Sequence, residues 1–309
     1  MIQTVLAFFI FSFICFLLIR QLPGSIAYAI YGANAQRLTN EELLRIEQAV
    51  LGEKSLVTQY MEWFTQLFKG NWGFSFSQQQ DVLQLIQQQY VYTIVIVVLA
   101  MILANVLIAC ILLLLHQWKH RVVRAVIEGV FLIAMIVPGF WMGFLLLWLF
   151  AVKLQLFPLY GIGNGQLLSL LYHALLPSVT LALPAVFYGV KLMQDQLIII
   201  QQQPFIEQLK LRRISKWRLV RHMFPHLGLV LLQLNGVLVT GFIGGTIAVE
   251  TVFSIPGLGK LTVEATKLHD YPTLLMIILL GLACVLIVQL LIDLMSCSLD
   301  PRVYKSLKD

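Results

Sequence analysis

Long apolar runs separated by polar connections dominate the pattern of this chain. Six runs approach or exceed the length that crosses a bilayer, about 20 residues of helix. They cover residues 1–19, 92–115, 125–152, 174–198, 226–249 and 273–296. Pro138, Pro177 and Pro184 lie within or near the third and fourth runs, where neighbouring helices can satisfy the carbonyl groups that a proline frees. The pattern predicts an all-α polytopic membrane protein with six transmembrane helices.

The first connection, about residues 20–91, is too long to be a simple link. Its stretch 39–70 has helical periodicity, with Thr39 or Asn40 as the N-cap and Glu41 and Glu42 in the first turn. Residues 70–73 begin and end with glycine and predict a break. We therefore expect a small helical segment outside the membrane.

Composition supports a membrane protein and excludes other classes. Hydrophobic residues make up 59% of the chain and charged residues only 12%, about half the usual share of soluble domains. A nucleic-acid-binding protein would need a basic, water-exposed domain, and the pattern leaves no room for one. We therefore expect the protein to lie in a membrane, with lipid as a partner and without nucleic acid.

The distribution of basic residues predicts the orientation. Basic connections remain on the cytoplasmic side, and they are the second, with Lys119, Arg121 and Arg124, and the fourth, with six basic residues between 210 and 221. Both termini are therefore expected inside, N-in and C-in. The predicted organisation is a first helix with its extracytoplasmic segment (1–87), a five-helix transmembrane domain (88–298) with a loop at about 201–225, and a cytoplasmic tail (299–309).

The loop at 201–225 carries more than a topology signal, because apolar residues alternate with its charges. They are Phe205, Leu209, Leu211, Ile214, Trp217 and Leu219. Pro204 is expected to start a short amphipathic helix and Pro225 to end one. Such a helix can bind lipid headgroups or insert an apolar ridge into a groove of a partner, and the residues alone leave both open.

The apolar run 226–249 differs from the others in its polar and small residues. They include Gln233, Asn235, Thr240, Gly241 and Gly245. Small residues let helices approach closely, and polar ones hydrogen-bond across an interface or line a water path. The set predicts either helix packing or a translocation path.

Enzyme motifs and metal sites are not apparent. The sequence GLGKLT at 257–262 fails the phosphate-loop pattern, because residue 254 is serine and Leu261 follows Lys260. Ionisable residues in the apolar runs are Glu128, Lys191, Asp195 and Asp293. All are expected near helix ends, with Lys191 paired to Asp195. No acidic residue is expected deep in the bundle, which argues against an ion-coupled secondary transporter, the alternative function.

Several ordered stretches together resemble one family. They are QLPGS (21–25), QYMEWFTQLFKGNWGFS (59–75), VPGFWMGFLLLWLFAVKLQLFPLYG (137–161), HALLPSVTLALP (173–184), VETVFSIPGLGKLTVEATKLHDYP (249–272) and LDPR (299–302). The chain resembles permease subunits of the dipeptide/oligopeptide/nickel class of ABC transporters, which are binding-protein-dependent type I importers. The resemblance covers about residues 22–302.

The resemblance implies a translocation subunit in the bacterial inner membrane with no catalysis and no cofactor of its own. It implies a second homologous permease, two cytoplasmic ATPase subunits that bind ATP and Mg²⁺, and an extracytoplasmic solute-binding protein. The solute would be a peptide or a related small solute, such as a nickel chelate, an antimicrobial peptide or a polyamine.

In this family the loop at 201–225 forms the coupling helix that contacts the ATPase. The residues expected to make that contact are Phe205, Glu207, Leu209, Leu211, Arg213, Trp217 and Arg218. Leu209, Leu211 and Arg213 stand where the family usually has Ala, Ala and Gly. The bulkier residues imply an adapted partner or altered coupling.

Overall fold

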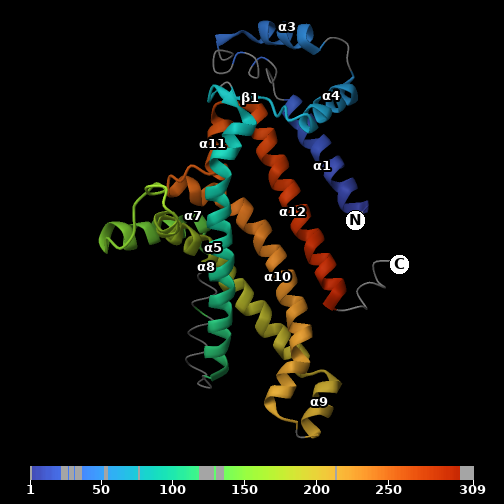
Figure 1. Ribbon diagram of the computed structural model, residues 1–309, viewed down its shortest axis with the longest axis vertical. Coiled ribbons are helices and arrows are strands. Elements are labelled where there is room, and N and C mark those ends of the chain that lie inside the picture. Colours follow the sequence, from blue (N-terminus) through green and yellow to red (C-terminus); the bar gives the residue numbers. More distant parts are fainter. Residues whose placement is uncertain are drawn as a thin grey trace. The chain divides into compact units, whose positions relative to one another are not determined.

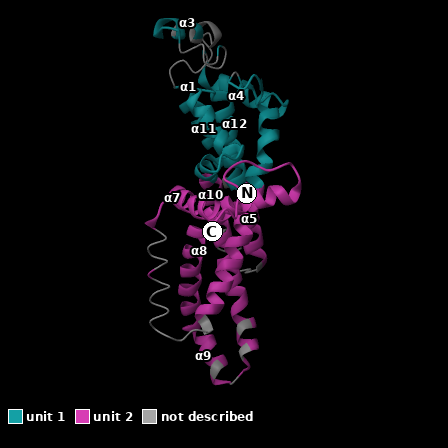
Figure 2. Ribbon diagram, turned by 90° about the vertical axis from the view of Figure 1, so that its left-hand side faces the viewer, with its two compact units in different colours: residues 1–94, 246–286 teal, residues 95–245, 287–309 magenta. Residues whose placement is uncertain are grey.

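The computed structural model describes residues 2–21, 27, 31, 37–51, 55–75, 77–117, 129, 136–212 and 214–299, and nearly all of its regular structure is helical (Figure 1). These residues form two compact units, one of residues 1–94 and 246–286 and the other of residues 95–245 and 287–309 (Figure 2). Three long helices contribute to both units: α5 (Val82–Gln117), α10 (Lys216–Val252) and α12 (Tyr271–Leu299).

The first unit begins with α1 (Ile2–Arg20), α3 (Asn40–Leu51) and α4 (Leu56–Phe68). The predicted cap of α3 is confirmed: the backbone amide of Thr39 donates to the Glu42 carboxylate at 2.8 Å, and the Glu42 amide donates back to the Thr39 hydroxyl at 3.4 Å. This reciprocal pair satisfies amides that a helix start leaves without partners. The helical stretch expected over 39–70 forms two helices, because Ser55 accepts a hydrogen bond from the Thr58 amide and starts α4.

A short β-pair follows α4, which the all-α prediction did not include. Strands β1 (Phe74–Ser75) and β2 (Gln80–Asp81) are antiparallel. The predicted break before them is confirmed, since Gly70 and Gly73 have φ values of +82° and +93°.

The core of the first unit is made of apolar and aromatic side chains from α1, α4, α5, α11 (Leu258–Lys267) and α12. Tyr60 packs edge-on against Phe16, and its hydroxyl lies 2.7 Å from the Ser12 hydroxyl, which places a satisfied polar contact among the rings. Helix α11 begins at Leu258, directly after Gly257, and its Leu261 side chain is buried in this core.

The second unit contains α7 (Gly139–Leu146), a π-helix (Leu147–Lys153), α8 (Leu167–Gln201) and α9 (Pro204–Leu211), with parts of the three long helices. Pro177 and Pro184 lie inside α8 without ending it, as expected for prolines in an apolar environment. The Ser178 hydroxyl donates to the Ile96 carbonyl at 3.1 Å and joins α8 to α5.

Four helices of the described residues are long and apolar enough to cross a membrane: Val82–Leu115, Leu167–Gln201, Trp217–Val252 and Tyr271–Ser298. Two further apolar helices, Thr4–Arg20 and Gly139–Lys153, are shorter. The six-helix count and the N-in, C-in orientation therefore stay predictions. Residues 125–128 and 130–135 of the third predicted span, 125–152, lie outside the described residues.

Candidate functional site

The predicted amphipathic helix at the basic segment exists as α9, which is anchored to its own chain by one face. Pro204 is its first residue, as predicted, and the Gln203 carbonyl accepts from the Ile206 amide at 3.0 Å. Ile206 is fully buried, and Phe205 and Leu209 pack half-buried beside it. The cluster also contains Ile200 and Leu197 of α8 and Met223, Leu219 and Leu227 of α10.

The opposite face of this segment is exposed. Leu211 and Trp217 have exposed fractions of 78% and 77%, and Glu207 and Arg218 are exposed beside them. The predicted contact set therefore divides: Phe205 and Leu209 face the chain, and the other four, which we call the outer face, point away from it. The remaining member, Arg213, lies outside the described residues.

The prediction that Pro225 ends a helix is wrong. Pro225 lies inside α10, which begins at Lys216 and continues to Val252. A proline removes one amide donor and leaves one carbonyl without its helical partner, a defect that helices in apolar surroundings tolerate. Trp217 and Arg218 consequently belong to the first turn of a long helix and not to a separate loop helix.

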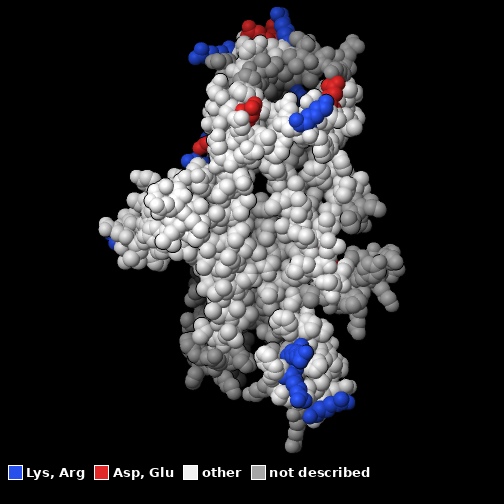
Figure 3. Space-filling model, in the orientation of Figure 1, with Lys and Arg blue, Asp and Glu red and all other residues white. Residues whose placement is uncertain are grey.

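Positive charge surrounds the outer face. Arg212, Arg218 and Arg221 are exposed, and Figure 3 shows Lys and Arg side chains gathered in the region where Figure 1 labels α9. Guanidinium groups form paired hydrogen bonds with carboxylates. The segment therefore presents exposed apolar side chains beside three arginines and one acid, Glu207, an arrangement suited to a partner groove that carries acidic groups.

The second unit contains an interhelical amide pair. The side-chain amide nitrogen of Asn105 in α5 donates to the side-chain oxygen of Asn235 in α10 at 2.7 Å, and the side-chain nitrogen of Asn235 donates to the side-chain oxygen of Asn105 at 3.2 Å. Each amide nitrogen also donates to a backbone carbonyl one turn earlier, that of Met101 or Leu231. All four side-chain donors are thus occupied, so in this conformation the pair joins two helices and offers no donor to a solute.

The other predicted residues of the run 226–249 fall on two faces of α10. Gly245 lies against Leu181, since a Cβ built on it would be 2.6 Å from that side chain. Gln233, Thr240 and Gly241 lie on an exposed face, with open space beside Gly241. Close packing and an accessible polar face are both present on this helix.

A buried carboxylate, which the sequence analysis missed, joins three helices in the first unit. Glu250, near the end of α10, has an exposed fraction of 0%. Thr93 of α5 donates its hydroxyl proton to one carboxylate oxygen at 2.6 Å, and the Lys260 amide donates to the other at 3.0 Å. The Thr93 oxygen also accepts from the Leu258 amide at 2.8 Å. Side chains of α5 and α10 therefore cap the start of α11, where helical amides have no partner in their own helix.

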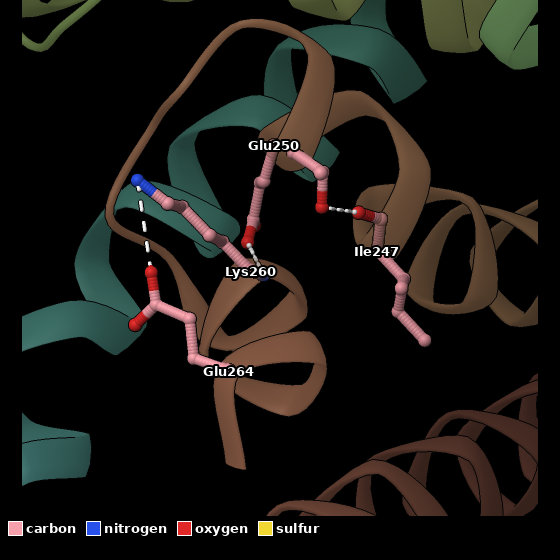
Figure 4. A network of polar contacts seen from close by, with 5 residues as sticks. Ile247, Glu250, Lys260 and Glu264 are labelled. Carbon is pink, nitrogen blue, oxygen red and sulfur yellow. Dashed lines mark hydrogen bonds and ion pairs between the residues drawn. The ribbon is translucent and has the colours of Figure 1, made fainter. Parts of the chain in front are cut away.

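Two glycines make this joint possible. A Cβ on Gly257 would lie 2.4–2.5 Å from the Glu250 carboxylate, and one on Gly259 would lie 2.6–2.7 Å from the backbone of Thr246 and Ile247. Figure 4 shows the Glu250 carboxylate directed at the start of α11, while the Lys260 side chain turns away towards Glu264. The GLG of 257–259, rejected as a phosphate loop, is thus explained by close packing around an acid.

A second buried acid, Asp270, fixes the start of α12. Its carboxylate accepts from the Thr273 amide at 3.4 Å, from the Ser77 hydroxyl at 2.6 Å and from the Ser75 hydroxyl. Glu250 and Asp270 are buried in the protein but lie just outside the predicted apolar runs 226–249 and 273–296, so the expectation that no acidic residue lies deep in the bundle stays a prediction. Both sit at the ends of apolar runs beside helix-starting signals, a combination that could have been recognised.

The predicted local pair of Lys191 and Asp195 is confirmed at 3.0 Å, and both side chains are about half exposed or more. Asp293 accepts a hydrogen bond from Gln289 at 2.9 Å. Glu128 lies outside the described residues. These contacts are local to one helix each and do not form a relay.

Comparison with known proteins identifies relatives along almost the whole chain. Residues 113–305 match the family described as binding-protein-dependent transport system inner membrane component. A probable peptide ABC transporter permease of Sinorhizobium fredii, y4tP, is 27% identical over 98% of this chain and 97% of its own length. The nickel import system permease NikB of Staphylococcus aureus is 24% identical over 98% of this chain and 89% of its own length.

Proposed function

Because this chain belongs to the family of binding-protein-dependent transport system inner membrane components, we propose that it is the permease subunit of an ATP-driven importer. It is a multi-pass protein of the bacterial inner membrane and an ABC permease of the peptide/nickel class. The outer face is the observation that best supports the ATP-driven role. Leu211 and Trp217 are exposed there within a basic segment, while the buried Ile206 packs α9 against its own chain.

The outer face is the proposed contact with a cytoplasmic ATPase subunit. Two such subunits would bind ATP and Mg²⁺, a second homologous permease would complete the pathway, and a solute-binding protein would deliver the solute. Phe205 and Leu209 act in this proposal mainly as anchors that hold α9 against α8 and α10, because they are half-buried in the cluster of their own chain. Leu211, Trp217 and Arg218 make the outward contact.

The proposed solute is a peptide, with a nickel chelate second and an antimicrobial peptide or polyamine third. The order follows the names of the relatives, of which the peptide permease is the more similar. Selection would rest mostly with the binding protein. The buried acids do not favour an ion-coupled carrier, since the oxygens of Glu250 and Asp270 already accept bonds from helix-start amides and hydroxyls.

Uptake into cells or proteoliposomes containing the assembled transporter tests the proposal. Uptake should require ATP and should stop when an ATPase subunit that binds but does not hydrolyse ATP replaces the native one. The purified chain alone should not hydrolyse ATP. Uptake that continues on an ion gradient after ATP is exhausted would refute the ATP-driven role.

A further inference from the structure

One helix of the first unit, α4, has an apolar face that the described residues leave exposed. Its covered face packs in the core of that unit through Tyr60, Trp63, Phe64 and Leu67. On the neighbouring side, Val57, Met61 and Phe68 have exposed fractions of 60%, 55% and 80%. Their spacings of four and seven residues place these three on one side of a helix. They form an apolar strip that we call the α4 stripe.

The opposite side of α4 is polar. Its exposed polar residues are Thr58, Glu62, Thr65 and Gln66. At 3.6 residues per turn, Glu62 and Gln66 lie about 120° and 160° around the helix from the centre of the α4 stripe. A helix with one apolar and one polar side is suited to a membrane surface, where the polar side remains in water.

The apolar surface of α1 continues the α4 stripe. Helix α4 lies beside α1 (Figure 1), and the centre of the Phe64 ring is 5.3 Å from that of Phe9 in α1 and 5.2 Å from that of Phe68. Phe9 is itself 43% exposed. From Ile2 to Ile19, α1 carries no charged residue. Exposed aromatic surface therefore passes from a charge-free helix across Phe64 to the end of the stripe.

The ring contacts also fix the level of α4 along α1. Phe16 and Phe9 precede Arg20, the first charged residue of the chain, by about 6 and 16 Å of helix. Phe16 packs on Tyr60, and Phe9 packs on Phe64. Helix α4 therefore lies beside the apolar run and not beyond its charged end. Helices in a membrane surface bury their apolar side about 5–10 Å deep, a level within this range.

We propose that α4 lies in the membrane surface, with the α4 stripe against the acyl chains of phospholipids and the side of Glu62 and Gln66 in water. A protein partner is the alternative cover. Lipid is favoured because the stripe continues into the exposed surface of a charge-free helix, and because the stripe carries no polar group that a partner could pair. The inference depends on the chain being a membrane protein and is independent of the proposed solute and of the ATPase contact.

Photo-crosslinking of the full-length chain tests this assignment. The photoreactive residue p-benzoylphenylalanine replaces Met61 or Phe68 on the stripe, or Glu62 or Gln66 as exposed controls on the polar side. The chain is reconstituted in vesicles of phosphatidylethanolamine and phosphatidylglycerol and irradiated, and mass spectrometry detects adducts of phospholipid mass. Both stripe positions should give lipid adducts, and both control positions should give few or none. Similar adducts at all four positions, or none at the stripe, would overturn the orientation of α4.

Irradiation in native membranes distinguishes lipid from a protein partner. The two stripe positions should again give lipid adducts there. Cross-linking of these positions to another protein in place of lipid would overturn the choice of occupant.

Cysteine labelling gives a second measurement without a bulky probe. Met61→Cys and Phe68→Cys should resist a membrane-impermeant maleimide in intact vesicles and react after solubilisation in SDS, because the reactive thiolate forms poorly in apolar surroundings. Glu62→Cys and Gln66→Cys should react in both conditions, above the background of the four native cysteines. Equal labelling of stripe and control cysteines in intact vesicles would place the stripe in water and refute the lipid contact.

Discussion

Removing the buried carboxylate of Glu250 should destabilise the chain far more than removing an exposed acid nearby. In Glu250→Ala the Lys260 amide and the Thr93 hydroxyl lose their acceptor inside the protein. A buried donor without a partner costs about 1–3 kcal/mol, so two donors cost roughly 2–6 kcal/mol. Glu250→Gln keeps the shape and one acceptor oxygen and should lie between the native chain and the alanine variant.

Glu264→Ala is the matched control, because Glu264 is a partly exposed acid on α11 that lies 3.8 Å from the Lys260 ammonium. A pair of this kind contributes about 0.2–1 kcal/mol. Thermal unfolding of the detergent-solubilised variants, followed by loss of the monodisperse species, measures the difference. Thr93→Val should couple to Glu250→Ala in a double-mutant cycle, since both groups serve one joint. Equal unfolding temperatures for Glu250→Ala and Glu264→Ala would refute the reasoning.

Three further predictions concern other parts of the chain. Trp217→Ala should weaken binding of the ATPase subunits by roughly 1–3 kcal/mol, as for a binding anchor, so that fewer of them are retained on washing. Thermal unfolding of the chain should not change. Unchanged retention would contradict the docking role. Asn105→Leu or Asn235→Leu alone should destabilise the chain, and a double-mutant cycle should show coupling of about 0.6–1.7 kcal/mol; additive effects would contradict the amide pair. The backbone amide of Thr39, and then its hydroxyl, donate to the Glu42 carboxylate and lower its pKa. The cap therefore stabilises α3 fully at pH values above the ordinary carboxyl pKa, and this stabilisation is lost as the pH falls through the lowered pKa of Glu42. Circular dichroism should show that Glu42→Gln is less helical than the native chain at neutral pH and equally helical in acid. A difference in helicity that does not change with pH would contradict this.

The long helices and their caps followed from the sequence because they depend on local patterns. Apolar runs predicted the ends of α5, α8, α10 and α12 within three residues, but these helices begin two to ten residues before the predicted runs. The candidate cap at Thr39 or Asn40 and the acidic first turn predicted the start of α3. Boundaries shifted where an amphipathic stretch joined an apolar one: α10 begins at 216 and not at 226. Local sequence does not reveal that a proline inside such a junction is tolerated.

The candidate sites were only partly predictable because burial depends on contacts between distant residues. The sequence placed Phe205, Leu209 and Trp217 on one amphipathic segment, but their division between inward and outward faces required the positions of α8 and α10. Glu250 was missed for a related reason, since its partner Thr93 is 157 residues away. Asn235 was identified as a polar residue of interest, and its partner Asn105 was not.

The joint at Glu250 also constrains the order in which the chain can mature during synthesis. Forming the first turn of an isolated short helix is unfavourable, and α11 receives its external amide acceptors from Thr93 and Glu250, both of which precede it in the chain. When α11 leaves the ribosome, every group that nucleates it is already present, so the corner can close before α12 is made. Asp270 then ties the new helix back to Ser75 and Ser77, which were synthesised far earlier. Translation from the N-terminus thus supplies each template before the segment that folds upon it.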